Sequence, residues 1–162
     1  IQAVGFDMYC RLLEQETSRL RGNPVTQSSG PMVDVDIDYY IPDAYIPDPG
    51  VKIRIYRRLL LATSEEDIEE IRAELNDRFG KPPRPVENFL QITLLRLMAR
   101  DKEIKLLRRK GKQIEIQLEK NLPHDVQQNL GGYQIRKLNA HTLVVRPEGD
   151  ALQTLQRVLQ MI

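Results

Sequence analysis

The clearest hydrophobic pattern in the chain lies in residues 63–80, TSEEDIEEIRAELNDRFG. At 100° per residue the apolar side chains of this segment share one narrow face, which predicts an amphipathic helix packed on a core. Thr63 or Ser64 is placed to cap the helix, with Glu66 or Asp67 in the return position of a capping box. Gly80 and the prolines after it predict the end of the helix. The apolar face consists of Ile68, Ile71, Leu75 and Phe79.

The rest of the chain mixes helical and strand-like patterns. Apolar residues at helical spacing predict helices over residues 3–20, 51–62, 86–102, 123–130 and 148–161. Alternating patterns predict a strand over residues 33–37, a hairpin of 104–110 with 113–118, and a second hairpin of 133–138 with 142–145. This order predicts an α+β fold, in which antiparallel β-hairpins form a small sheet packed against several helices.

The pattern also predicts three parts of the chain. Residues 1–22 form a separate amphipathic helix, residues 23–32 a small, polar, proline-bracketed linker, and residues 33–162 a single domain of ordinary size. Because the chain opens with Ile1 inside a helical pattern, we expect it to be a piece of a larger protein.

Four acidic side chains lie opposite the apolar face of the 63–80 helix: Glu66, Glu70, Glu74 and Asp77. Acids in the first turn favour the helix dipole, but Glu74 and Asp77 occupy the last turns, where the dipole disfavours them. One interpretation is a solvated face on which Arg78 partly neutralises Glu74. The other is an electrostatic docking face for a basic partner. We call these four residues the acidic row.

Basic residues gather elsewhere, although the net charge of the 162 residues is only +1. The 51–62 helix carries Arg57 and Arg58, and the first hairpin ends in a basic tip of Arg108, Arg109, Lys110 and Lys112. These side chains could contact nucleic acid phosphates, so an accessory DNA-binding domain is an alternative function. The structural interpretation is that the helix bases pair with neighbouring acids and that the tip protects a strand pair.

Signatures of catalysis and of metal binding are missing. No phosphate-binding glycine loop occurs, and His124, His141 and the single Cys10 do not have zinc-site spacing. Three aspartates in the 33–38 segment lack the turn glycine and distal glutamate of a calcium loop. We therefore expect a non-catalytic chain without a cofactor or metal site of its own.

Localisation follows from equally simple features. The chain has one cysteine, no signal peptide and no apolar run near the roughly 18 residues of a membrane span. These features predict a cytoplasmic protein that neither enters nor crosses a membrane.

Two segments resemble one family. GFDMYCRLLE at residues 5–14 resembles the helix that follows the motor of bacterial transcription-repair coupling factors, the Mfd family. The second resemblance is to the C-terminal domain of that family. It rests on Asp38, the repeated Ile-Pro-Asp at 41–43 and 46–48, YRR at 56–58, IEEI at 68–71, and EL and DRFG around Asn76.

The resemblance implies a regulatory, autoinhibitory role for this chain in transcription-coupled DNA repair. The parent would be an ATP-driven translocase on double-stranded DNA that removes stalled RNA polymerase and recruits UvrA in the bacterial cytoplasm. Its ATP and Mg²⁺ would bind upstream of Ile1. The C-terminal domain would pack on the N-terminal UvrB-like domain and mask the surface that UvrA binds. Carried onto this sequence, the family's acidic contact pair is Glu74 and Asp77, with Glu66 and Glu70 supporting them.

Overall fold

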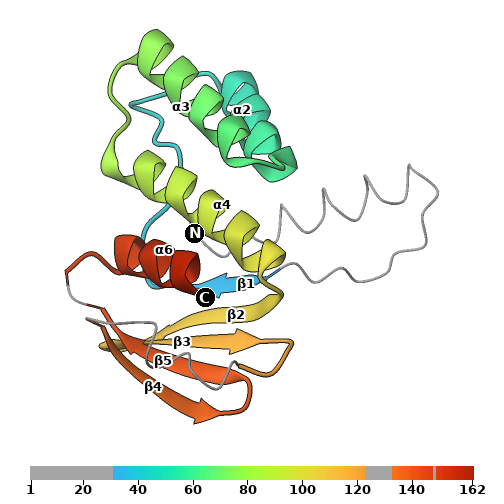
Figure 1. Ribbon diagram of the computed structural model, residues 1–162. Helices are drawn as coiled ribbons and strands as arrows, with labels where there is room; N and C mark the ends of the chain where they lie inside the picture. Colours follow the sequence, from blue (N-terminus) through green and yellow to red (C-terminus); the bar gives the residue numbers. More distant parts are fainter. Residues whose placement is uncertain (1–30, 123–132, 148) are drawn as a thin grey trace. The chain divides into compact units, whose positions relative to one another are not determined.

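The computed structural model describes residues 31–122, 133–147 and 149–162 (Figure 1). The described residues divide into two compact units, one containing residues 38–90 and the other residues 31–37, 91–122, 133–147 and 149–162. The helices predicted for 3–20 and 123–130, most of the predicted linker, Cys10 and His124 lie outside the described residues.

The first unit contains a pair of capped helices. Helix α2 (Pro49–Leu61) begins where an Asp48 side-chain oxygen accepts a hydrogen bond from the Val51 amide at 2.8 Å. Helix α3 (Glu65–Phe79) begins with a complete capping box between Ser64 and Asp67. It ends at Gly80, whose φ of +80° favours glycine. Both predicted ends of α3 are therefore confirmed.

Helix α4 (Arg84–Asp101) starts in this unit, and the boundary between the units falls within it. The Phe89 ring lies against two tyrosines, 5.9 Å from Tyr39 and 5.4 Å from Tyr56 between ring centroids. The Asn88 side chain donates a hydrogen bond of 2.9 Å to the Asp38 carbonyl, which joins the two ends of the unit. The most deeply buried side chains of the first unit are those of Ile46, Ile55, Ile68, Ile71, Leu75, Val86, Phe89 and Leu90.

The second unit is built on one sheet, in which five strands are arranged in the order β1-β2-β3-β5-β4. Both predicted hairpins are present, β2 (Ile104–Lys110) with β3 (Gln113–Leu118) and β4 (Gln134–Asn139) with β5 (Thr142–Arg146). Gly111, with φ of +59°, opens the two-residue turn of the first hairpin.

The sheet departs from the prediction at its first strand. Strand β1 (Met32–Asp34) pairs in parallel with β2, so the sheet is mixed rather than assembled from antiparallel hairpins alone. The strand predicted for residues 33–37 also ends early, and the Ile37 amide donates a hydrogen bond of 2.8 Å to the Val35 carbonyl of its own segment. The aspartates of that segment therefore do not form a row along one strand.

One face of the sheet is covered by helix. The inward residues of the central strands are almost fully buried, namely Leu107, Ile114, Ile116, Leu143 and Val145. Helix α6 (Ala151–Met161), capped by Asp150, buries Leu152, Leu155, Val158 and Leu159 on the same side as the second half of α4 (Figure 1). Helices on one face of a five-stranded sheet confirm the α+β class.

Candidate functional site

The acidic row lies where the hydrophobic pattern places it. Ile68, Ile71 and Leu75 are at most 2% exposed, so the apolar stripe of α3 faces the core of the first unit. The side chains on the opposite side face solvent, which leaves Glu66, Glu70 and Asp77 exposed. Glu74 differs from them, because its side chain is only 29% exposed.

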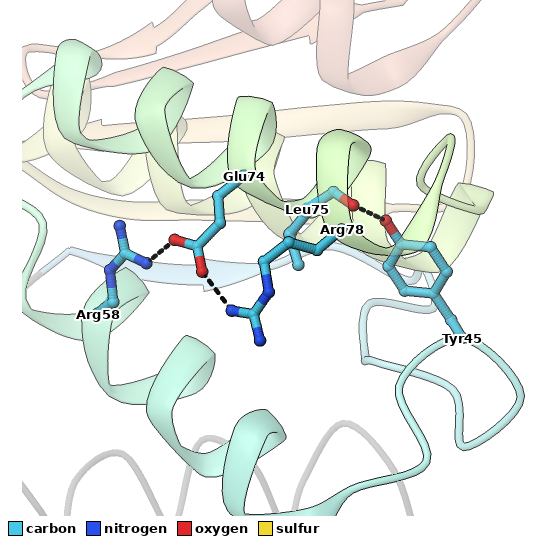
Figure 2. A network of polar contacts seen from close by, with 5 residues as sticks. All are labelled: Tyr45, Arg58, Glu74, Leu75 and Arg78. Atoms are coloured by element: carbon cyan, nitrogen blue, oxygen red, sulfur yellow. Dashed lines mark hydrogen bonds and ion pairs between the residues drawn. The ribbon is translucent and has the colours of Figure 1, made fainter.

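Glu74 is held by two arginines of its own unit. One carboxylate oxygen accepts a hydrogen bond from Arg58 of α2, and the other accepts one of 2.6 Å from Arg78, one turn further along α3 (Figure 2). Hydrogen bonds from Arg58 and then from Arg78 lower the pKa of Glu74 below its ordinary value of 4.5. The structural interpretation, that bases pair with neighbouring acids, is confirmed for these two arginines. The acidic row is thus partly neutralised at Glu74.

Asp77 has a different environment. Its carboxylate makes no ion pair with any residue that the structure describes, and it projects from the last turn of α3. The unfavourable position against the helix dipole is therefore not offset within the described part of the molecule. Asp77 is the member of the predicted contact pair that is available to an outside cation.

The end of α3 that carries Asp77 is held by Tyr45. The Tyr45 hydroxyl donates to the Gly80 carbonyl at 2.8 Å and lies 3.1 Å from the Leu75 carbonyl. Its ring meets that of Phe79 edge to face at a centroid separation of 5.9 Å. Burial, and then the charge of Glu87, raises the pKa of Tyr45 above its ordinary value of 10.0. The sequence prediction missed Tyr45, whose one distinctive feature is its place between two Pro-Asp turns.

A shallow hollow of about 160 Å³ adjoins Glu74 on the surface between α2 and α3. Two apolar side chains of α2 contribute to its wall, and the remaining lining is charged. The lining residues are Val51, Arg54, Ile55, Arg58, Glu74 and Arg78. We refer to this feature as the arginine hollow.

The basic residues of the alternative DNA-binding hypothesis fall in separate units. Arg57 and Arg58 belong to the first unit, and the hairpin tip belongs to the second. At the tip, Arg108 lies 3.5 Å from the carboxylate of Asp34, and Lys110 lies 4.0 Å from that of Glu115. Arg109 donates a hydrogen bond of 3.2 Å to the Gly111 carbonyl, and Lys112 is exposed. Several of these cations have internal partners, and DNA binding stays a prediction.

Within residues 31–122, 133–147 and 149–162, no three His, Cys, Asp or Glu side chains gather in a way that could hold a metal ion. Over those ranges, too, no helix has both the length and the apolar character required to cross a membrane.

The described residues therefore define a small α+β domain with a mixed five-stranded sheet and a charged helix surface ordered by ion pairs. A family model described as "TRCF domain" matches residues 35–129, and the chain belongs to this family. The fold and the family confirm the resemblance of the second segment to the C-terminal domain of the family, whereas residues 5–14, which carry the first resemblance, lie outside the matched and described residues.

Named relatives agree with this assignment. The chain is 36% identical over 120 residues to the transcription-repair-coupling factor of Staphylococcus haemolyticus (strain JCSC1435), covering 73% of this chain and 10% of that protein. It is 35% identical over 101 residues to the factor of Myxococcus xanthus, covering 62% of this chain and 8% of that protein. A solved structure, described as the crystal structure of the C-terminal domain of transcription-repair coupling factor, aligns with a TM-score of 0.69. It is 27% identical and covers 81% of this chain and 92% of that chain.

The chain spans about a tenth of the length of these curated relatives. It has the fold of the C-terminal domain of a transcription-repair coupling factor.

Proposed function

We propose that this chain is a non-catalytic regulatory domain that docks, through α3, on the UvrB-like N-terminal domain of its parent coupling factor. Docking would mask the surface that UvrA binds and so hold the parent in an autoinhibited state. The observation that carries the proposal is the exposed carboxylate of Asp77, which forms no ion pair among the described residues and lies on a helix end that Tyr45 holds in place. A fixed anion on a rigid element is suited to meet a basic surface at small entropic cost.

Glu74 has a different part in this proposal from Asp77. Its carboxylate is already bonded to Arg58 and Arg78, so a partner arginine would have to displace one of them. Such an exchange leaves the number of ion pairs nearly unchanged and gains little free energy. Asp77 therefore provides most of the attraction, Glu74 orients the partner, and Glu66 and Glu70 extend the negative field.

The strength of these contacts fits a releasable latch. Exposed ion pairs contribute only about 0.2–1 kcal/mol each, too little for a tight complex between separate molecules. Within one polypeptide, a tether raises the effective concentration to roughly millimolar, where weak contacts suffice. The same weakness lets UvrA or a rearrangement of the parent open the latch, which would expose the UvrA site during repair of a lesion that stalls RNA polymerase.

The experiment is a charge reversal in the full-length coupling factor. Asp77→Arg should increase the fraction of factor that captures UvrA, measured by pull-down at fixed salt. Glu65→Arg is the matched control, because it makes the same charge change at an exposed position of α3 outside the acidic row. Equal capture of UvrA by the Asp77→Arg variant and the natural sequence would refute the latch.

A second experiment locates the contact. The chain is mixed with the isolated UvrB-like domain at roughly millimolar concentration, which matches the effective concentration of the tether, and binding should weaken as salt rises. Asp77→Arg should abolish binding, and reversal of one partner arginine to glutamate should restore it. Restoration by every reversed arginine alike would indicate a general charge effect instead of a specific pair.

A further inference from the structure

The arginine hollow beside Glu74 carries a positive charge that its own residues do not neutralise. Three guanidinium groups, those of Arg54, Arg58 and Arg78, line it together with one carboxylate. Arg58 and Arg78 each use a terminal nitrogen on Glu74, and a guanidinium has five N–H donors, so donors remain on both. Arg54 is exposed and makes no ion pair with any residue in the described part of the chain.

We propose that the arginine hollow is a binding site for a carboxylate side chain presented by a protein partner. An incoming aspartate or glutamate would accept hydrogen bonds from Arg54 and from the unused donors of Arg58, while its methylene groups lie against Val51 and Ile55. The inference takes the identity of the partner from the proposed function, but carboxylate binding itself does not depend on it.

The surroundings favour a protein carboxylate over nucleic acid. Double-stranded DNA carries a negative charge about every 1.7 Å, so a strand in this hollow would pass close to other anions. Glu74 lines the hollow itself, and Glu70 and Asp77 lie on the same side of α3. A single carboxylate on an alkyl stem meets the arginines without bringing further charge to the acidic row. The apolar wall of Val51 and Ile55 likewise suits an alkyl stem better than a phosphate.

The consequence is a docking face that carries both signs of charge. Asp77 attracts a cation of the partner, and the arginine hollow accepts an anion beside it. A partner surface must present a base and an acid at matching positions. A partner that docked at a position shifted along α3 would place like charges next to each other. This arrangement fixes the register of docking, which a purely acidic face does not.

The first experiment tests the hollow without any assumption about the partner. Isovalerate, a carboxylate on a branched alkyl group, is titrated into the chain while the methyl resonances of Val51 and Ile55 are followed by NMR. We expect saturable shifts at both residues and roughly tenfold weaker binding in Arg54→Glu, since hydrogen bonds to a charged group contribute about 1.5 kcal/mol or more. Arg57→Glu, an equal charge change on α2 outside the hollow, should bind within about twofold of the natural sequence.

Three results would overturn the inference. The first is the absence of saturable shifts, and the second is an equal loss of isovalerate affinity in the Arg54→Glu and Arg57→Glu variants. The third is tighter binding of inorganic phosphate or of a short DNA duplex than of isovalerate. Circular dichroism on each variant verifies the fold, which the exposed positions of both arginines should preserve.

The second experiment relates the hollow to docking. Binding of the chain to the isolated UvrB-like domain should weaken about tenfold with Arg54→Glu and about twofold or less with Arg57→Glu. If Asp77→Arg abolishes binding and Arg54→Glu leaves it unchanged, docking stands and the role of the hollow in it is wrong. If Asp77→Arg has no effect, the proposed docking function fails, and the isovalerate titration alone decides whether the hollow binds carboxylates.

Discussion

Replacing Glu74 by glutamine tests how strongly the ion pairs of the acidic row stabilise the first unit. The change keeps the shape of the side chain but removes the charge shared by Arg58 and Arg78. The Glu74 side chain is 29% exposed and each arginine 44%, so each pair is expected to contribute about 0.2–1 kcal/mol. Because the two pairs share one carboxylate, the substitution should lower the free energy of unfolding by roughly 0.5–1.5 kcal/mol in total.

The assay is urea unfolding at pH 7, followed by circular dichroism at the helical band. A double-mutant cycle with Arg58→Gln separates the direct pair from the background and should give a coupling of roughly 0.5 kcal/mol. Amide exchange at Leu59 and Leu75, both buried in the first unit, reports whether the loss is local to α2 and α3. Glu70→Gln is the matched control, because Glu70 is exposed and lacks an ion pair among the described residues.

The pH dependence supplies an independent check. The pKa of Glu74 is lower in the folded chain than its ordinary value of 4.5, so its contribution is fully present above pH 4.5. The contribution is lost as the pH falls through the lower folded value, and below that the natural sequence and Glu74→Gln should be equally stable. A coupling energy of zero between Glu74 and Arg58 at pH 7 would refute the assigned role of these pairs. So would a loss of unfolding free energy in Glu70→Gln equal to that in Glu74→Gln.

Three further substitutions test the ends of α3. Tyr45→Phe removes the hydroxyl that holds the carbonyls at the end of the helix, and should lower the free energy of unfolding by about 1 kcal/mol in urea titration. No loss would mean that water replaces the hydroxyl. Gly80→Ala should cost roughly 1 kcal/mol through its φ of +80° alone, since nothing lies within 4 Å of the added carbon. Unchanged thermal stability would contradict this. Ser64→Ala removes one half of the capping box and should cost about 0.5–2 kcal/mol, whereas Ser64→Asp, which keeps an acceptor, should retain most of the stability in the same melts.

Some of the fold was predictable because its causes are local in sequence. The N-terminal end of α3 follows from its capping box and the C-terminal end from Gly80. The first hairpin follows from the turn at Gly111 and the alternation of Ile114, Ile116 and Leu118 after it. The parallel pairing of β1 is different in kind. Three residues carry too short an alternation to specify a partner, and the strand pairs with a segment that lies roughly 70 residues further along the chain.

The candidate site likewise has some features that the sequence predicts and others that it does not. The solvent-facing position of Asp77 follows from helical periodicity, and so does its separation from the apolar stripe. The pairing of Arg58 with Glu74 depends on the register between two helices, which a one-dimensional pattern does not contain. Tyr45 was missed for a similar reason, because its hydroxyl reaches backbone carbonyls that any sequence would provide.

The hydrogen bond between Asn88 and Asp38 has a consequence for how the sheet closes. Met32 of β1 pairs with Leu106 of β2, roughly 70 residues away along the chain. Once the first unit has folded, its two ends are tied together at 2.9 Å, and roughly 20 residues remain in the loop that this pairing must close. Closure entropy changes by about 0.6 kcal/mol for each doubling of loop length, so a folded first unit lowers the closure cost by about 1 kcal/mol. We therefore expect the edge strand to be added late, after the first unit has shortened the path between β1 and β2.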